Sequence, residues 1–145
     1  MTEVAFHFGA PDKLGYAGRL LRKASSVGAR LWVVADNSQS QTLGALLWAI
    51  SPTSFLAHCH EDAEPAVRRR SAVMLASGAG QGAEGYSVLV NLGAGMPSGF
   101  ERFERVIEVV SQDEQDRHNA RQRWKRYTEL GYLITRHDLN LRPGP

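Results

Sequence analysis

The sequence predicts an α/β protein with three layers: helices on both faces of a mostly parallel sheet of about five strands, in a Rossmann-like topology. Two observations predict it. Short β-rich runs alternate along the chain with segments in which apolar residues recur at helical spacing, the pattern of βαβ units. Residues 31–35 form an apolar, uncharged run, which is typical of a strand buried on both sides in a parallel sheet. A length of 145 residues favours a single domain, expected over residues 1–140, with 141–145 as a flexible tail.

The first half of the chain alternates between strand and helix. Residues 4–8 are β-rich and predict a first strand. Pro11 and Asp12 open a helix in which apolar residues keep helical spacing until Gly28 ends it. After the second strand, at 31–35, capping residues precede a second helix that Pro52 stops.

The second half is expected to hold several strands and one polar helix. The helix spans 112–130 and is closed by Gly131. The expected strands are 54–58, 72–76, 86–92, 106–110 and 132–135.

Composition excludes several classes of protein. Hydrophobic residues make up 43% of the chain and charged residues 22%, which excludes a disordered tail or a coiled-coil rod. No apolar run is long enough for a membrane span, and no signal peptide is visible, so we expect no membrane contact. A single cysteine, Cys59, cannot form an internal disulfide, and a cytoplasmic location is therefore expected.

Motifs for catalysis, cofactors and metals are not convincing. The glycine-rich segment 77–85 is followed by an expected strand, whereas a dinucleotide-binding loop precedes a helix, so we interpret it as a surface connection. His58 and His60 flank Cys59, but the chain offers no second ligand cluster, so we interpret them as a strand end. We therefore expect no cofactor, no bound metal and no catalytic residue.

An aromatic pair marks the end of the second expected helix and the segment that follows. Trp48 lies beside the apolar stripe of that helix, and Phe55 follows a proline turn. Two interpretations stay open. Taken alone, the residues favour packing of both rings in the core, whereas an aromatic pair at a rim is typical of a protein-binding anchor.

The helix near the C-terminus is unusually basic. From 117 to 126 it holds five basic residues and no acidic one. At 3.6 residues per turn, its exposed face is expected to carry Arg117, Arg121, Trp124, Lys125 and Thr128. The opposite face, with Ala120, Tyr127 and Leu130, is expected to contact the core. Cations around an indole suit an acidic peptide with an aromatic end, or single-stranded nucleic acid. The alternative is a solvated basic helix.

These two groups of residues, in this order on an α/β chain of this length, resemble the chi subunit family of bacterial DNA polymerase III. Ala57 departs from the proline that family members often carry, and residues 61–85 match little. The segments that carry the resemblance are 4–8, 19–24, 28–34, 47–58, 88–92, 103–110, 121–127 and Gly131.

The resemblance implies a non-catalytic subunit that bridges two partners. One is the psi subunit of the clamp loader, which Trp48 and Phe55 would face. The other is the acidic C-terminal tail of the single-stranded-DNA-binding protein, which implies an indirect association with single-stranded DNA. The residues that would bind this tail are Arg121, Trp124, Lys125 and Thr128, with Arg117 or Arg126 to supply the charge that Thr128 lacks.

Two rival hypotheses come from other classes of protein. In the first, residues 117–126 bind single-stranded nucleic acid directly. In the second, the chain is a nucleotide-dependent enzyme that uses the glycine-rich segment 77–85.

Overall fold

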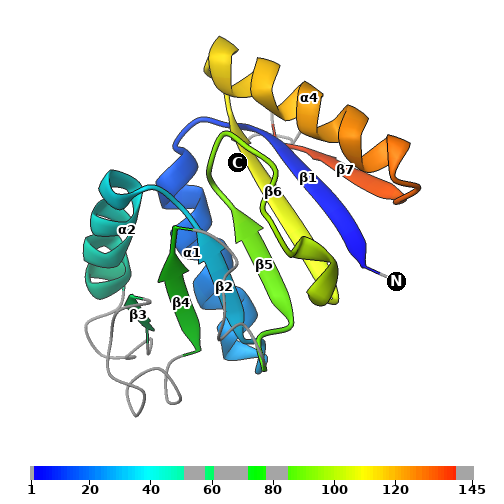
Figure 1. Ribbon diagram of the computed structural model, residues 1–145. Coiled ribbons are helices and arrows are strands. Elements are labelled where there is room, and N and C mark those ends of the chain that lie inside the picture. Colours follow the sequence, from blue (N-terminus) through cyan, green and yellow to red (C-terminus); the bar gives the residue numbers. More distant parts are fainter. Residues whose placement is uncertain (1, 51–57, 61–71, 78–84, 140–145) are drawn as a thin grey trace.

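The computed structural model describes residues 2–50, 58–60, 72–77 and 85–139. Its centre is a parallel sheet with the strand order β3-β4-β2-β5-β6-β1-β7 (Figure 1). Every strand pairs with its neighbours in parallel. The strands are β1 (Glu3–Ala10), β2 (Leu31–Val34), β3 (His58–His60), β4 (Val73–Ala76), β5 (Val88–Asn91), β6 (Arg105–Ser111) and β7 (Ile134–Asp138).

The α/β prediction is confirmed, although the described residues form a sheet of seven strands rather than about five. The two edge strands, β3 and β7, correspond to the expected segments 54–58 and 132–135 but differ from them in their bounds. β3 spans three residues, and of the expected strand 54–58 only its last residue lies among the described residues. β7 begins two residues after the expected start at 132 and continues to Asp138. Its polar sequence is tolerated because an edge strand faces solvent.

Among the described residues, three α-helices flank the sheet: α1 (Lys13–Ser26), α2 (Asn37–Ile50) and α4 (Glu114–Glu129). Their starts follow from capping. The Asp12 carboxylate accepts a hydrogen bond from the Gly15 N–H, and Asp113 does the same for Asp116. The Asp36 carboxylate accepts from the Gln39 N–H, while the Gln39 side chain accepts from the Asp36 N–H. The three predicted helices are thus confirmed.

Two hydrophobic cores occupy the two faces of the sheet. α1 and α2 contact each other and pack on one face, where Leu21 and Leu43 are fully buried. α4 packs on the other face through Ala120 and Tyr127. Because side chains alternate along a strand, Glu108 of β6 points toward α4, between Val106 and Val110 of the same core. This alternation places one carboxylate beneath the basic helix.

Within the described part of the chain, no helix is long and apolar enough to cross a membrane. The expected division into residues 1–140 and a tail at 141–145 stays a prediction, since residues 140–145 lie outside the described residues.

Candidate functional site

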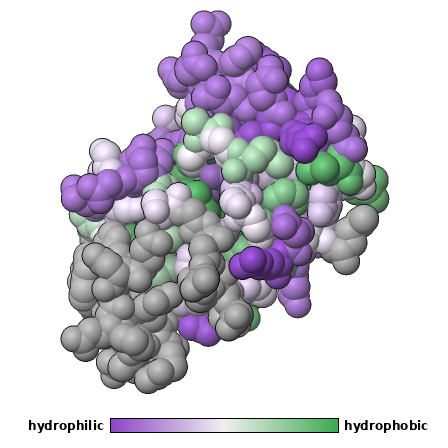
Figure 2. Space-filling model, viewed as in Figure 1, coloured by the Kyte–Doolittle hydropathy of each residue, from purple (hydrophilic) through white to green (hydrophobic). Residues whose placement is uncertain are grey.

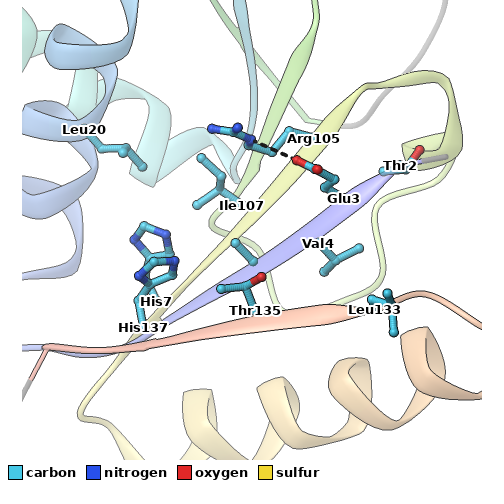
Figure 3. Close-up of a pocket in the computed structure, with 11 residues that line it drawn as sticks. Thr2, Glu3, Val4, His7, Leu20, Arg105, Ile107, Leu133, Thr135 and His137 are labelled. Atoms are coloured by element: carbon cyan, nitrogen blue, oxygen red, sulfur yellow. Dashed lines mark ion pairs between the residues drawn. The ribbon is translucent and has the colours of Figure 1, made fainter.

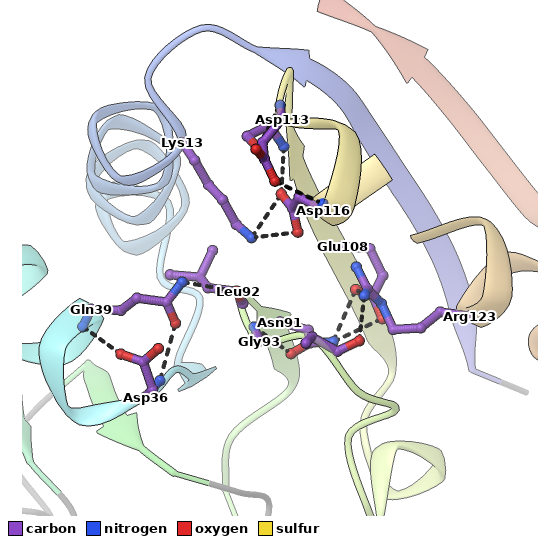
Figure 4. A network of polar contacts seen from close by, with 12 residues as sticks. Lys13, Asp36, Gln39, Asn91, Leu92, Gly93, Glu108, Asp113, Asp116 and Arg123 are labelled. Atoms are coloured by element: carbon purple, nitrogen blue, oxygen red, sulfur yellow. Dashed lines mark hydrogen bonds and ion pairs between the residues drawn. The ribbon is translucent and has the colours of Figure 1, made fainter. Parts of the chain in front are cut away.

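The first turn of α4 is anchored by an acidic residue. Asp116 forms an ion pair of 3.1 Å with Lys13 of α1 (Figure 4). It also accepts a hydrogen bond of 2.8 Å from the Ser111 N–H. Burial opposes the charged carboxylate, but the Ser111 N–H and the Lys13 ammonium outweigh burial and hold the pKa of Asp116 below its usual range. The helix therefore begins at a fixed point between α1 and β6.

The middle of α4 is anchored by a buried polar network. The Nε of Arg123 lies 2.9 Å from the carboxylate of Glu108, and its Nη1 donates to the Ala94 carbonyl at 2.8 Å. The Asn91 amide donates to the same carboxylate at 2.9 Å (Figure 4). The Tyr127 hydroxyl also donates to it, at 2.7 Å. The side chains of Arg123 and Glu108 are 2% and 0% exposed. Removing Arg123 or Glu108 would leave the other as a buried charge without its partner.

Burial raises the pKa of Glu108, while Arg123, Tyr127 and Asn91 oppose that shift by stabilising the carboxylate. Burial, followed by the adjacent Glu108, also raises the pKa of Tyr127 well above its usual range, so its hydroxyl stays protonated and remains a donor. The network therefore fixes the rotation of α4 about its own axis, which decides which side chains face solvent.

The solvent-facing side of α4 carries cations that pair with no acidic side chain in the described part of the chain. Arg117, Arg121 and Lys125 are exposed, as the sequence predicted, and lie four residues apart in succession. Within the described ranges, none of the three forms an ion pair, whereas Arg126 is paired with Glu129 at 3.6 Å. Figure 2 shows hydrophilic side chains gathered over α4. This row of cations can attract carboxylates.

The position of Trp124 corrects one expectation. The sequence predicted an exposed indole, but the ring is half-buried and packs against the core. Its centroid lies 5.1 Å from that of Phe6 and 5.9 Å from that of Phe8, both on β1. The guanidinium of Arg136 lies over the ring of Phe8, at 4.6 Å. The aromatic surface beside the cations is therefore shared between α4 and β1.

Of the other predictions for α4, those for three residues are confirmed and the one for Leu130 is wrong. Thr128 is exposed as predicted, and its hydroxyl donates to the Trp124 carbonyl at 3.0 Å. Ala120 and Tyr127 are buried as predicted. Leu130 was expected to contact the core, yet it is 46% exposed, because it follows the last turn of the helix as its C-cap.

Sequence reasoning missed the role of Arg123 and Glu108. Two signals were present: Arg123 lies at i+3 from Ala120 and i−4 from Tyr127, on the buried face, and Glu108 is an acid inside an apolar strand. Phe8 and Arg136 were also missed, since their closeness to Trp124 depends on the packing of β1 and β7 beside α4.

The second predicted surface is not described at the level of side chains. Trp48 lies in α2, but its side chain is outside what the structure describes, as is all of Phe55. Whether the two rings form a partner surface stays a prediction. Of the glycine-rich segment, residues 78–84 are also outside the described residues, and β5 follows it at Val88.

Comparisons with known proteins agree on a family. A family model described as "DNA polymerase III chi subunit, HolC" matches residues 1–135. The DNA polymerase III subunit chi of Pseudomonas aeruginosa is 31% identical over 131 residues, which cover 88% of this chain and 87% of that protein.

One solved structure resembles this chain in its fold. The C-terminal domain of an S. cerevisiae Dbp5 variant, solved with a Gle1 variant and IP6, superposes with a TM-score of 0.62. It covers 95% of this chain and 90% of that chain at 12% identity, so it carries no argument about function.

Proposed function

Because the chain belongs to the family of DNA polymerase III chi subunits, we propose that it acts in DNA replication as a non-catalytic adaptor. In this proposal one surface binds the psi subunit of the clamp loader, and another binds the acidic C-terminal tail of the single-stranded-DNA-binding protein. Such a role places it in the cytoplasm, with the replicating chromosome.

One observation carries the tail-binding half of the proposal: α4 is held rigidly by buried polar contacts while it presents three unpaired cations to solvent among the described residues. Cβ atoms four residues apart on a helix lie about 6 Å from each other, so Arg117, Arg121 and Lys125 form a row. Such a row suits successive carboxylates of an extended acidic peptide, and a guanidinium can also bind a terminal carboxylate with two hydrogen bonds.

The aromatic surface supports a ligand that ends in an apolar ring. Trp124 and Phe8 are both partly exposed, and their rings lie side by side next to the cations. A phenyl ring placed against their edges would gain aromatic contact without displacing the core. The combined surface therefore fits a peptide with a run of acidic residues followed by an aromatic residue at its C-terminus.

The same packing argues against the rival use of this helix. Direct binding of single-stranded nucleic acid by residues 117–126 needs the face of a ring on which a base can stack. The Trp124 ring is instead packed against Phe6 and Phe8, which leaves only part of it to solvent. The geometry favours an edge-on contact with a small ring over base stacking.

The sheet topology supports a bridging role. α2, which contains Trp48, contacts β3 at one edge of the sheet, and α4 contacts β7 at the other edge. With about 4.8 Å between neighbouring strands, these edges lie roughly 29 Å apart. Partners bound at the two edges would therefore use separate surfaces of the molecule.

Fluorescence anisotropy of a labelled acidic peptide that ends in a free phenylalanine tests the tail-binding site. We expect R121A and K125A to weaken binding about tenfold each, and added salt to weaken it further. R102A is the matched control, because Arg102 is exposed but lies in the short helix at Phe100–Arg102, outside α4. Equal affinity in all four proteins would refute the proposed site.

A further inference from the structure

A trough lies on the sheet face opposite α4, where the structure describes no helix over β1 and β7. It consists of two adjoining hollows of about 670 and 640 Å³ that share His7, Leu20 and His137. Figure 3 shows both imidazoles rising from neighbouring strands, with Leu20 of α1 beside them.

The two ends of the trough differ chemically. The end near the start of β1 is lined by apolar groups such as Leu20, Ile107 and Leu133, and its Arg105 is paired with Glu3 (Figure 3). Leu133 is 85% exposed. The other end is lined by rings and cations: His7, Tyr16, Arg19, Lys23 and His137.

The rings of the second end form a compact group. His7 and His137 are register partners on β1 and β7, and their ring centroids lie 4.6 Å apart. The Nδ1 of His7 is 2.5 Å from the Tyr16 hydroxyl. Burial, and then the neighbouring His137, lowers the pKa of His7 to about 4, so at neutral pH its ring is an uncharged aromatic surface. His137 is exposed and completes the group on the solvent side.

The cations of this end have no acidic partner in the described part of the chain. Arg19 and Lys23 are exposed, lie four residues apart on α1, and form no ion pair there. α1 contains no acidic residue between Lys13 and Ser26. The carboxylate at this end, Asp138, is paired with Arg136 at 3.3 Å.

We propose that this trough binds single-stranded DNA directly, with bases stacked on the exposed His137 ring and phosphates against Arg19 and Lys23. Cations beside rings are the combination that single-strand binders use, since stacking tolerates any base. An acidic peptide without an aromatic residue would use the two cations but leave the rings without a partner. The proposed site lies on the face of the sheet opposite α4 and its adaptor surface, so one molecule could contact both the strand and the tail of the protein that coats it.

The test is anisotropy of a labelled 12-nucleotide oligo-dT with the full chain alone at low salt. We expect weak binding that falls with salt, with a slope of log affinity against log salt near −1.4 for two phosphate contacts. The R19A/K23A double variant should lose about tenfold in affinity and flatten that slope. H137A should weaken binding and H137F should retain it, because phenylalanine restores the ring.

Matched variants separate this site from the adaptor surface. R121A and K125A should leave oligo-dT binding unchanged, and R19A/K23A should leave binding of the acidic peptide unchanged. Thermal melting of each variant checks that it is folded. The proposal is overturned if the folded protein does not bind oligo-dT, if R121A and K125A rather than R19A/K23A abolish binding, or if R19A/K23A weakens only the peptide.

Discussion

Both faces of α4 carry arginine, but on the buried face the arginine stabilises the fold and on the exposed face it is available to bind a ligand. Arg121 and Arg123 are two residues apart, yet Arg121 is exposed without an ion pair among the described residues, whereas Arg123 is 2% exposed. The buried guanidinium is held by Glu108 and the Ala94 carbonyl. A basic stretch in a sequence therefore mixes structural and binding residues. The structural ones are those that face an acidic side chain on the sheet beneath the helix. Substitutions on the two faces should separate stability from binding.

The largest effect is expected for R123A. It leaves the Glu108 carboxylate buried without its cation, which should lower the free energy of unfolding by about 3–5 kcal/mol. R121A, on the exposed face, should change it by about 0.5 kcal/mol or less. Urea unfolding of the two variants makes the comparison. Similar losses in both would mean that the two faces do not differ as described.

Trp124 lies between the two faces, and W124A should therefore affect both properties. Loss of its contacts with Phe6 and Phe8 should cost about 2–3 kcal/mol of unfolding free energy, less than for a fully buried tryptophan. Binding of the acidic peptide should weaken as well. W124F should recover most of the stability. If W124A weakens binding without any loss of stability, the ring is not packed on β1.

A smaller effect is expected on the opposite side of β1. The pKa of His7 is about 4 in the folded protein, below its ordinary value of 6.5, so the folded state binds fewer protons between these values. Stability should therefore fall as the pH is lowered from 6.5 to 4, by about 1–2 kcal/mol after allowance for the partial exposure of the ring. Unfolding of H7F across this range should show a shallower pH dependence than the parent. Parallel profiles would contradict the shifted pKa.

Local sequence patterns were enough to predict the central elements. The apolar run at 31–35 and the helical spacing in α1 and α4 follow from burial, which leaves its period in the sequence. The edges were harder, because β7 has the polar sequence ITRHD and owes its strand conformation to pairing with β1. The residues of β7 alone do not indicate that this segment pairs with β1.

The site was predictable on its exposed side and not on its buried side. Arg117, Arg121, Lys125 and Thr128 follow from helical periodicity alone. The partners of Arg123 and the rings against Trp124 come from other strands; Phe6 lies 118 positions before Trp124. The trough was also beyond the sequence, because it depends on the register that places His7 beside His137. Contacts between segments that are distant in the sequence produce no periodic pattern of residues, so they could not be predicted from it.

The role of α4 as the peptide-binding site can be tested by a ¹H–¹⁵N NMR titration of the full chain with the acidic, phenylalanine-ended peptide. We expect the largest chemical-shift changes on the exposed residues of α4 and on the indole N–H of Trp124, while the amide signals around Arg19 and Lys23 do not shift. Changes confined to α1 and β7, with the exposed face of α4 unaffected, would contradict the claim that this face is the peptide-binding site.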